Sequence, residues 1–412
     1  MLKRWTKTLS VLLAPVAACA VALPATAATA PTRTVKYLGT RHVWPGVVFR
    51  TYETTGPKGP VLGDLLDVDL RNPRVAVGLL HPPAVAARET VSAMADAQHA
   101  VAGVNGDFFN ISETHAGVPA TGSAVGPEVA GGRALKAAVP FGQRFGPMPP
   151  EGATTEDVIG VGADRTARIS ALHLTGTADG PGPRIEVGGL NQYALQVGGV
   201  GAFTSAWGPV SRLRSVCGTD TSRAAACSVN TEEVTVRRGT VTHAGTAIGA
   251  GAIPPDTTVL VGREAGADAL RRLRPGDRVR IAYHLSGPGH LRFAVGGFGI
   301  LRDGAAPPDL DAVTLAARTA AGVSRNGRHL YLVVADASSP ASTGLTLAGL
   351  AALLREMGAD DAMDLDGGGS TTLVLRGPGE PVASVRNFPP NGVERPVANG
   401  IGVFAQRGLT GK

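Results

Sequence analysis

The residues best suited to chemistry are two acidic side chains directly before a run of glycines, Asp364-Leu365-Asp366-Gly367-Gly368-Gly369-Ser370. Alternate residues of a strand point to the same face, so Asp364 and Asp366 are predicted to project together, with backbone positions roughly 6.6 Å apart. Three glycines allow a loop to bring several N–H groups against an anion. A nucleotide-binding P-loop is excluded because its lysine is missing, and an EF-hand because Leu375 replaces its closing glutamate.

A second polar cluster, Asn105-Gly106-Asp107-Phe108-Phe109-Asn110, follows a short apolar run. Ligand-binding groups are commonly found where a buried strand ends, so Asn105 and Asp107 are candidate site residues. Two arginines stand in other motifs, Arg318-Thr319 and Arg395-Pro396-Val397-Ala398-Asn399. A planar guanidinium beside a glycine loop suits bidentate binding of phosphate.

Other common hydrolytic motifs are missing from the sequence. It contains no His-Glu-x-x-His motif and no Gly-x-Ser-x-Gly motif. The closest candidate histidine pair, His284 and His290, straddles a Gly-Pro-Gly turn. Hydrolysis by two transition metals or by a serine triad is therefore disfavoured.

The elements that must position these residues are mostly strands. Apolar runs bounded by turn residues predict strands over 65–70, 75–80, 101–104, 293–295, 319–324, 329–334, 361–366 and 371–375. Asn326-Gly327 is a strong hairpin signal between two of them. Two helices are predicted, over 90–97 and over 346–357, the second capped by Thr346 and stopped by Gly358.

These elements predict a mixed α/β protein of the α+β class, with mixed sheets, a few helices and a β-rich insertion. The predicted catalytic domain is split into an N-terminal part, 28–145, and a C-terminal part, 293–412. Residues 146–292 are the β-rich insertion. Within the first part, residues 31–60 are read as an entry segment interrupted by Pro and Gly.

Composition supports a folded protein with many turns. The 412 residues are 43% hydrophobic and 17% charged, which permits a large core, and 56 glycines disfavour an all-helical fold. The formal net charge is +6, but Lys3, Arg4 and Lys7 contribute three of these charges. The dispersed remainder argues against a nucleic-acid partner.

The N-terminus reads as a signal peptide over residues 1–27. Basic residues precede an apolar stretch from Leu9 to Leu23, and Ala25-Thr26-Ala27 fits a signal-peptidase site. The stretch is too short for a membrane anchor, and no later segment reaches transmembrane length. We expect a secreted protein, with lipoprotein anchoring at Cys19 as a minor alternative.

Removal of the signal peptide leaves two cysteines, Cys217 and Cys227. In an oxidising compartment such a pair is expected to form a disulfide. A zinc site is less suited, because no histidine lies near them in the sequence.

Taken together and in order, the motifs resemble the phosphodiester glycosidase family. The resemblance rests on Asn105–Phe109, Gly296-Gly297, Leu301–Gly304, Arg318–Gly322, Leu332–Asp336, Gly344–Thr346, Asp364–Ser370 and Arg395–Asn399. It covers about 60–145 and 290–405. This chain departs from the family pattern at Asp107, where the family often has a second Gly; at Asp364, where it often has Asn; and at Ala337, where it often has Gly.

The resemblance implies hydrolysis of a sugar-1-phosphodiester, such as a GlcNAc-α-1-phosphate diester, at the anomeric carbon. Asp366, Asp107 and Asp364 are the catalytic candidates; the substrate-binding candidates are Asn105, Arg318, Asp336, Gly367, Gly368, Gly369, Ser370, Arg395 and Asn399. No cofactor is required in this interpretation. The alternatives are a non-catalytic module that binds phosphorylated glycans or cell-wall polymers, and a wall protein stabilised by calcium on Asp364 and Asp366.

Overall fold

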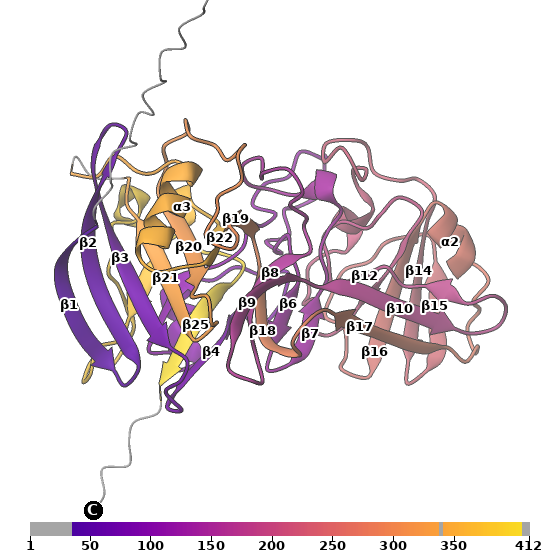
Figure 1. The fold of residues 1–412 in the computed structure, drawn as a ribbon. Coiled ribbons are helices and arrows are strands. Elements are labelled where there is room, and N and C mark those ends of the chain that lie inside the picture. Colours follow the sequence, from indigo (N-terminus) through magenta and orange to yellow (C-terminus); the bar gives the residue numbers. More distant parts are fainter. Residues whose placement is uncertain (1–34, 338–340, 406–412) are drawn as a thin grey trace, which may run out of the picture. The chain divides into compact units, whose positions relative to one another are not determined.

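The structure is a computed structural model that describes residues 35–337 and 341–405 (Figure 1). The predicted signal peptide and Cys19 lie outside the described residues. Within them, most of the regular structure is strand, with three α-helices and four short 3-10 helices. The protein is therefore mainly β, and helices contribute less than the predicted α+β class implies.

A seven-stranded antiparallel sheet carries half of the predicted site motifs. Its strands, in spatial order, are β1 (Lys36–Trp44), β2 (Val47–Gly56), β3 (Gly59–Asp69), β21 (His329–Ala335), β20 (Arg318–Val323), β22 (Asp361–Leu365) and β19 (Phe298–Leu301). The hairpin predicted around Asn326-Gly327 is confirmed, because β20 pairs antiparallel with β21. The entry segment prediction is wrong, since β1 and β2 are long strands that pair with each other and with β3.

A five-stranded sheet packs against this first sheet. Its order is β24 (Ser384–Val385), β23 (Leu373–Leu375), β5 (Ala102–Asn105), β25 (Gly400–Ala405) and β4 (Val75–Leu80). One hydrophobic cluster joins the two sheets, with Leu332 and Val334 from β21 against Val104 from β5 and Ile401 from β25. Burial of that cluster fixes which face of each strand points inward.

Helices cover the outer faces of both sheets. Helix α3 (Leu347–Glu356) lies over β20 and β21 in Figure 1, and its buried leucines share a cluster with Ala320 and Val333. Thr346 caps it by accepting a hydrogen bond from the Gly349 N–H at 3.0 Å, as predicted. Helix α1 (Val91–Ala97) packs on the five-stranded sheet through Val91 and Met94.

Three further sheets make up the rest of the described chain. One is ordered β7 (Arg133–Lys136), β6 (Glu128–Ala130), β18 (Leu291–Gly296), β8 (Asp157–Gly162), β9 (Ala167–Ala171). A second is β11 (Ile185–Glu186), β10 (His173–Asp179), β17 (Arg280–Ser286). The third is β12 (Gly189–Leu190), β13 (Val200–Phe203), β16 (Thr257–Arg263), β14 (Thr231–Arg237), β15 (Thr240–Gly245).

The remaining helices are α2 (Ala265–Leu270), η1 (Phe141–Gln143), η2 (Leu213–Val216), η3 (Gly368–Ser370) and η4 (Pro390–Gly392). No helix among the described residues is long and apolar enough to cross a membrane. The segment 146–292 is rich in strands, as predicted. Its strands β8 and β9 nevertheless share a sheet with β6 and β7 from the preceding segment. The three-part division of the chain stays a prediction.

The predicted disulfide is present between Cys217 and Cys227. It closes a loop whose backbone is bonded to the segment around η1. The Gly142 N–H donates to the Asp220 carbonyl at 2.8 Å, and the Arg223 guanidinium donates to the Arg144 carbonyl at 2.8 Å. The disulfide loop thus holds the chain just before Phe145.

Candidate active site

The site lies where β5, β20, β22 and β25 have their ends on one side of the two packed sheets. Asn105, the last residue of β5, is fully buried and joins the sheets. Its amide oxygen accepts from the Thr319 hydroxyl at 2.7 Å and from the Thr372 N–H at 3.0 Å, while its amide nitrogen donates to the Asp366 carbonyl at 2.5 Å. Asn105 is therefore a positioning residue for the Asp366 backbone.

Asp107 is held two residues beyond that strand end. Its N–H donates to the Asn399 side-chain oxygen at 2.9 Å, and its carboxylate accepts from the Gly126 N–H at 2.6 Å. Glycines are required around it, because a Cβ at Gly296 would lie 2.4 Å from its carboxylate oxygen. Burial raises the pKa of Asp107 to about 6, although the hydrogen bond from Gly126 opposes this rise.

Asp366 follows the end of β22 and is partly exposed. Its carboxylate accepts from the Ser370 hydroxyl at 2.6 Å, and Arg395 in turn donates to that hydroxyl at 3.3 Å. Burial raises the pKa of Asp366 to about 7, and the negative charge of Asp107 adds to the rise. Asp366, Ser370 and Arg395 are thus linked by hydrogen bonds. The Asp366 N–H also donates at 2.8 Å to the carbonyl of Gly106, the residue before Asp107.

Glycines allow the close approach of this loop to its neighbours. A Cβ on Gly369 would lie 1.9 Å from a guanidinium nitrogen of Arg395, so only glycine permits the arginine to lie against the backbone. The Gly368 N–H already donates to the Ala317 carbonyl at 2.8 Å. The Gly368 N–H therefore positions the loop and is not free to bind an anion.

Asp364 has different surroundings from Asp366. Strand β22 ends at Leu365, so the alternation that predicted a common direction does not extend to Asp366. Asp364 is paired with Phe298 and Ala320 and is buried, and neither of its carboxylate oxygens has a hydrogen-bond partner among the described residues. Burial raises its pKa to about 8, with Arg318 opposing this rise.

Arg318 is buried beside Asp364 rather than displayed to solvent. It donates to the Leu345 carbonyl at 3.0 Å and to the Thr314 carbonyl at 2.9 Å. These bonds tie the start of β20 to the segment before α3. Its predicted part in substrate binding is untested, but much of its donor capacity is already used within the protein.

Asp336 is the last of the predicted site residues. It accepts at 3.2 Å from both the Asn387 amide and the Phe388 N–H, and Asn387 also donates to the Thr371 carbonyl at 3.1 Å. No sequence signal marks its neighbour Asp64, a carboxyl whose ionised form is also disfavoured by burial. Burial raises the pKa of Asp64 to about 7 and that of Asp336 to about 6.

A buried lysine was also missed by sequence reasoning. Lys136 is completely buried and donates to the carbonyls of Val125, Gly126 and Ala137 at 3.2, 2.6 and 2.7 Å. It fixes the Gly126 peptide, whose N–H holds Asp107. Burial lowers the pKa of Lys136 to about 8, but the nearby charges of Glu128 and Asp107 oppose this. A lone lysine in a strand of four residues gives no sequence signal for this role.

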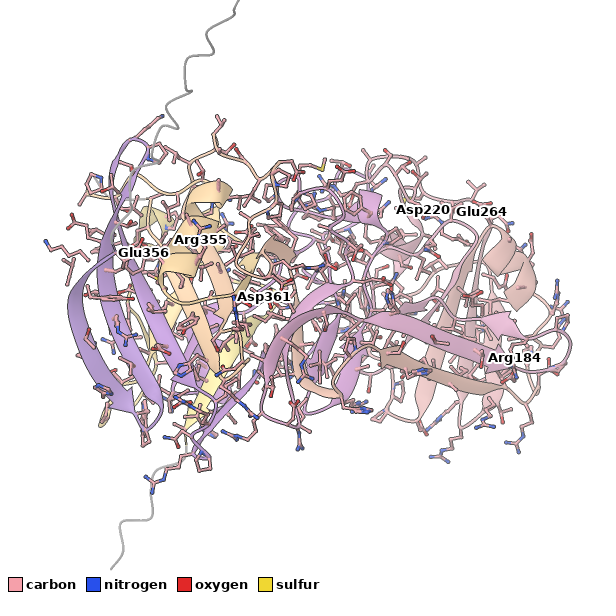
Figure 2. All side chains as sticks on the ribbon, viewed as in Figure 1. Arg184, Asp220, Glu264, Arg355, Glu356 and Asp361 are labelled. Carbon is pink, nitrogen blue, oxygen red and sulfur yellow. A yellow bond between two sulfur atoms is a disulfide. The ribbon has the colours of Figure 1, made fainter. Side chains whose placement is uncertain are left out.

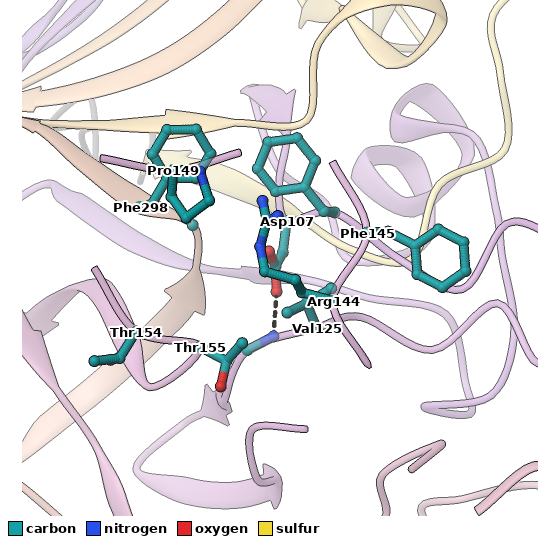
Figure 3. Close-up of a pocket in the computed structure, with 11 residues that line it drawn as sticks. Asp107, Val125, Arg144, Phe145, Pro149, Thr154, Thr155 and Phe298 are labelled. Carbon is teal, nitrogen blue, oxygen red and sulfur yellow. Dashed lines mark hydrogen bonds between the residues drawn. The ribbon is translucent and has the colours of Figure 1, made fainter. Parts of the chain in front are cut away.

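A narrow pocket opens beside Asp107 (Figure 3). It is lined by Arg144, Phe145, Pro149 and Phe298 among others, and its volume is about 10 Å³, enough for about one water molecule. Arg144 lines the same pocket as Asp107, and its guanidinium donates to the Pro147 carbonyl. The Arg144 backbone is held by the disulfide loop, so tertiary structure alone brings it to this pocket.

A metal site is not evident from the side chains present. Among the described residues, the single group of three residues able to ligate one ion is His115 with Cys217 and Cys227, whose sulfurs form the disulfide. Calcium requires six to eight oxygen ligands. Asp364 and Asp366 form no group with a third acidic or histidine side chain among the described residues, and calcium on this pair stays a prediction.

Comparisons with known proteins agree with the motif resemblance. Residues 230–404 match the sequence profile of the phosphodiester glycosidase family. The resemblance predicted from the sequence is therefore confirmed by the match to the family profile over residues 230–404. No curated protein matches the chain.

Two solved structures share the fold over most of the chain, and a third is a more distant match. A hypothetical protein from Synechocystis is 21% identical with a TM-score of 0.68; the match covers 92% of this chain but only 65% of the Synechocystis chain. A putative exported protein from Burkholderia pseudomallei is 20% identical with a TM-score of 0.67, covering 91% of this chain and 97% of that one. The zebrafish N-acetylglucosamine-1-phosphodiester alpha-N-acetylglucosaminidase catalytic domain, auto-inhibited by its pro-peptide, is 16% identical with a TM-score of 0.39, covering 91% and 89%.

Proposed function

We propose that this protein is a secreted hydrolase that cleaves the glycosidic C–O bond of a sugar-1-phosphodiester, such as a GlcNAc-α-1-phosphate diester. The observation that carries the proposal is that Asp366, linked to Arg395 through Ser370, is bonded by its backbone to Gly106, the residue before Asp107. Both carboxyls have raised pKa values, which suits groups that exchange protons near neutral pH. The family match over 230–404 supports the reaction class.

In the proposed reaction the oxygen of water forms a bond to the anomeric carbon while the bond from that carbon to the phosphate oxygen breaks. The phosphate monoester leaves with the electron pair, and a carboxylate accepts the proton that water loses. Asp107 suits the contact with water, because its pocket has room for about one molecule. Asp366 suits stabilisation of the oxocarbenium-like transition state.

The leaving group explains why a strong general acid is unnecessary. A phosphate monoester has a second pKa of about 6, so it departs without full protonation. Arg395 lies beside Asp366 through Ser370 and can neutralise the charge that develops on phosphate. Secretion is part of the proposal because the disulfide is compatible with an oxidising compartment.

The test is hydrolysis of a GlcNAc-1-phosphodiester by the purified protein in water enriched with oxygen-18. The label is expected on the anomeric hydroxyl of the released sugar. Label on the phosphate instead would show cleavage at phosphorus and overturn the glycosidase proposal. Binding of the diester without release of sugar would favour the non-catalytic glycan-binding module.

A further inference from the structure

A second cavity, separate from the Asp107 pocket, lies between β17 and β18. Its volume is about 750 Å³, which is in the range that holds an oligosaccharide-sized ligand. Its polar lining side chains include Arg133, Arg292, His284, His290 and Tyr283. No aspartate or glutamate lines it.

The two arginines in this groove have no partners of opposite charge. Neither Arg133 nor Arg292 forms an ion pair or a side-chain hydrogen bond within the described residues, although sixteen ion pairs are formed elsewhere. Both are exposed on their strands. Burial raises the pKa of the half-buried Tyr283, and the positive charge of Arg133 opposes this rise. The groove is therefore positively charged and has unused donors for an anion.

Strand β18 connects this groove to the catalytic carboxylate. Arg292 and Gly296 are four residues apart on β18, which separates their backbone positions by about 13 Å. A bulge between Leu291 and Phe293 places Arg292 at an irregular position of the strand, where it is exposed. The Cβ direction at Gly296 points to the Asp107 carboxylate, 2.4 Å away. The groove and Asp107 thus lie along the same strand, at its two ends.

We propose that the groove lined by Arg133 and Arg292 binds a second phosphate group of the substrate. The natural substrate is then a chain of phosphodiester-linked units rather than an isolated sugar-1-phosphodiester. This inference rests on the proposed function, because that function identifies the polymer in the groove as a phosphodiester. Guanidinium groups bind phosphate through paired N–H donors, and no stacked pair of aromatics offers a platform for nucleobases here.

The experiment measures binding without requiring turnover. The Asp366→Asn protein is titrated with a fluorescent poly(glycerol phosphate) oligomer and with an uncharged dextran oligomer of similar length. The charge-removing pair Arg133→Gln/Arg292→Gln is introduced in the same background. A matched pair, Arg272→Gln/Arg355→Gln, removes two exposed charges elsewhere; Arg355 is labelled at the end of α3 in Figure 2.

Binding of the phosphate oligomer is expected to exceed that of dextran and to weaken about tenfold at low salt in the groove variant, but not in the matched pair. Equal affinity of the groove variant and the parent would overturn the proposal. So would equally tight binding of an oligothymidylate, which would indicate an unspecific cationic surface.

The outcome separates the two proposals. If the parent protein hydrolyses no sugar-1-phosphodiester but the groove still binds the phosphate oligomer, the glycosidase proposal is refuted and the groove proposal is supported. Hydrolysis of a small GlcNAc-1-phosphodiester without binding of the oligomer would do the reverse.

Discussion

At the scale of single residues, the site is defined by carboxyls whose surroundings differ. Asp366 is partly exposed and bonded to Ser370, whereas Asp364 is enclosed without hydrogen bonds among the described residues. We therefore expect Asp366→Asn to keep the fold, since its volume is unchanged, and to lower kcat by about 10²–10⁴-fold. Steady-state kinetics on a sugar-1-phosphodiester measures this, with the exposed Asp303→Asn as control. A kcat close to that of the parent would remove Asp366 from the mechanism.

The raised pKa of Asp366 also predicts a pH profile. If Asp366 acts as the carboxylate, kcat/KM rises with pH and levels off above the pKa of about 7. Rate measurements between pH 5 and 9 on the parent protein test this. A rate that falls over the same range would instead assign Asp366 the role of the acid.

Lys136 is the residue on which the Asp107 loop depends. Lys136→Met removes the donor to three buried carbonyls, of which that of Val125 keeps a bond from the Val139 N–H, and removes the cation beside Asp107 and Glu128. We expect a loss of about 3–5 kcal/mol in the free energy of unfolding, as for other broken buried charge arrangements. Urea unfolding measures the free energy of unfolding of this variant and of the control Lys58→Met, which changes an exposed lysine. A loss no larger than that of Lys58→Met would contradict the role given to Lys136.

At the scale of elements, the disulfide loop connects the strand-rich segment to the site. It holds the backbone at Gly142 and Arg144, and Arg223 stacks on the Phe145 ring at 3.9 Å. Cys217→Ser/Cys227→Ser opens a loop of about ten residues, which predicts a loss of just under about 3 kcal/mol. Denaturant unfolding measures the loss, with the reduced parent as a second comparison. Equal stability of oxidised parent and variant would contradict this prediction.

At the scale of the whole molecule, buried carboxyls dominate the pH dependence of stability. Six have raised pKa values: Asp64, Asp107, Glu128, Asp336, Asp364 and Asp366. Their pKa in the unfolded chain is near 4, so the folded state binds more protons between about pH 4 and 8. The free energy of unfolding should therefore fall as pH rises through this window.

Asp364 has the highest of these pKa values and makes the test sharp. Asp364→Asn should flatten the fall of Tm between pH 5 and pH 8, because the variant has no proton to lose there. Calorimetry at the two pH values measures the difference, and Asp303→Asn serves again as control. An unchanged slope in Asp364→Asn would show that other groups cause the dependence.

Local signals in the sequence were sufficient for several elements and for the family resemblance. Asn326-Gly327 determined a hairpin, and Thr346 with Gly358 bounded helix α3, because turn and capping preferences act within a few residues. The two cysteines predicted their own disulfide. The ordered motifs predicted the family that residues 230–404 match.

The tertiary structure alone decided which candidates work together. Strand alternation could not show that β22 ends before Asp366, and so could not separate Asp366 from Asp364. Lys136 reaches the loop that holds Asp107, and Arg144 reaches the pocket beside it, through contacts between segments distant in sequence, and no periodic pattern marks either residue. Burial, which raises these pKa values, is a property of the packed sheets. It is therefore fixed only when the whole chain has folded.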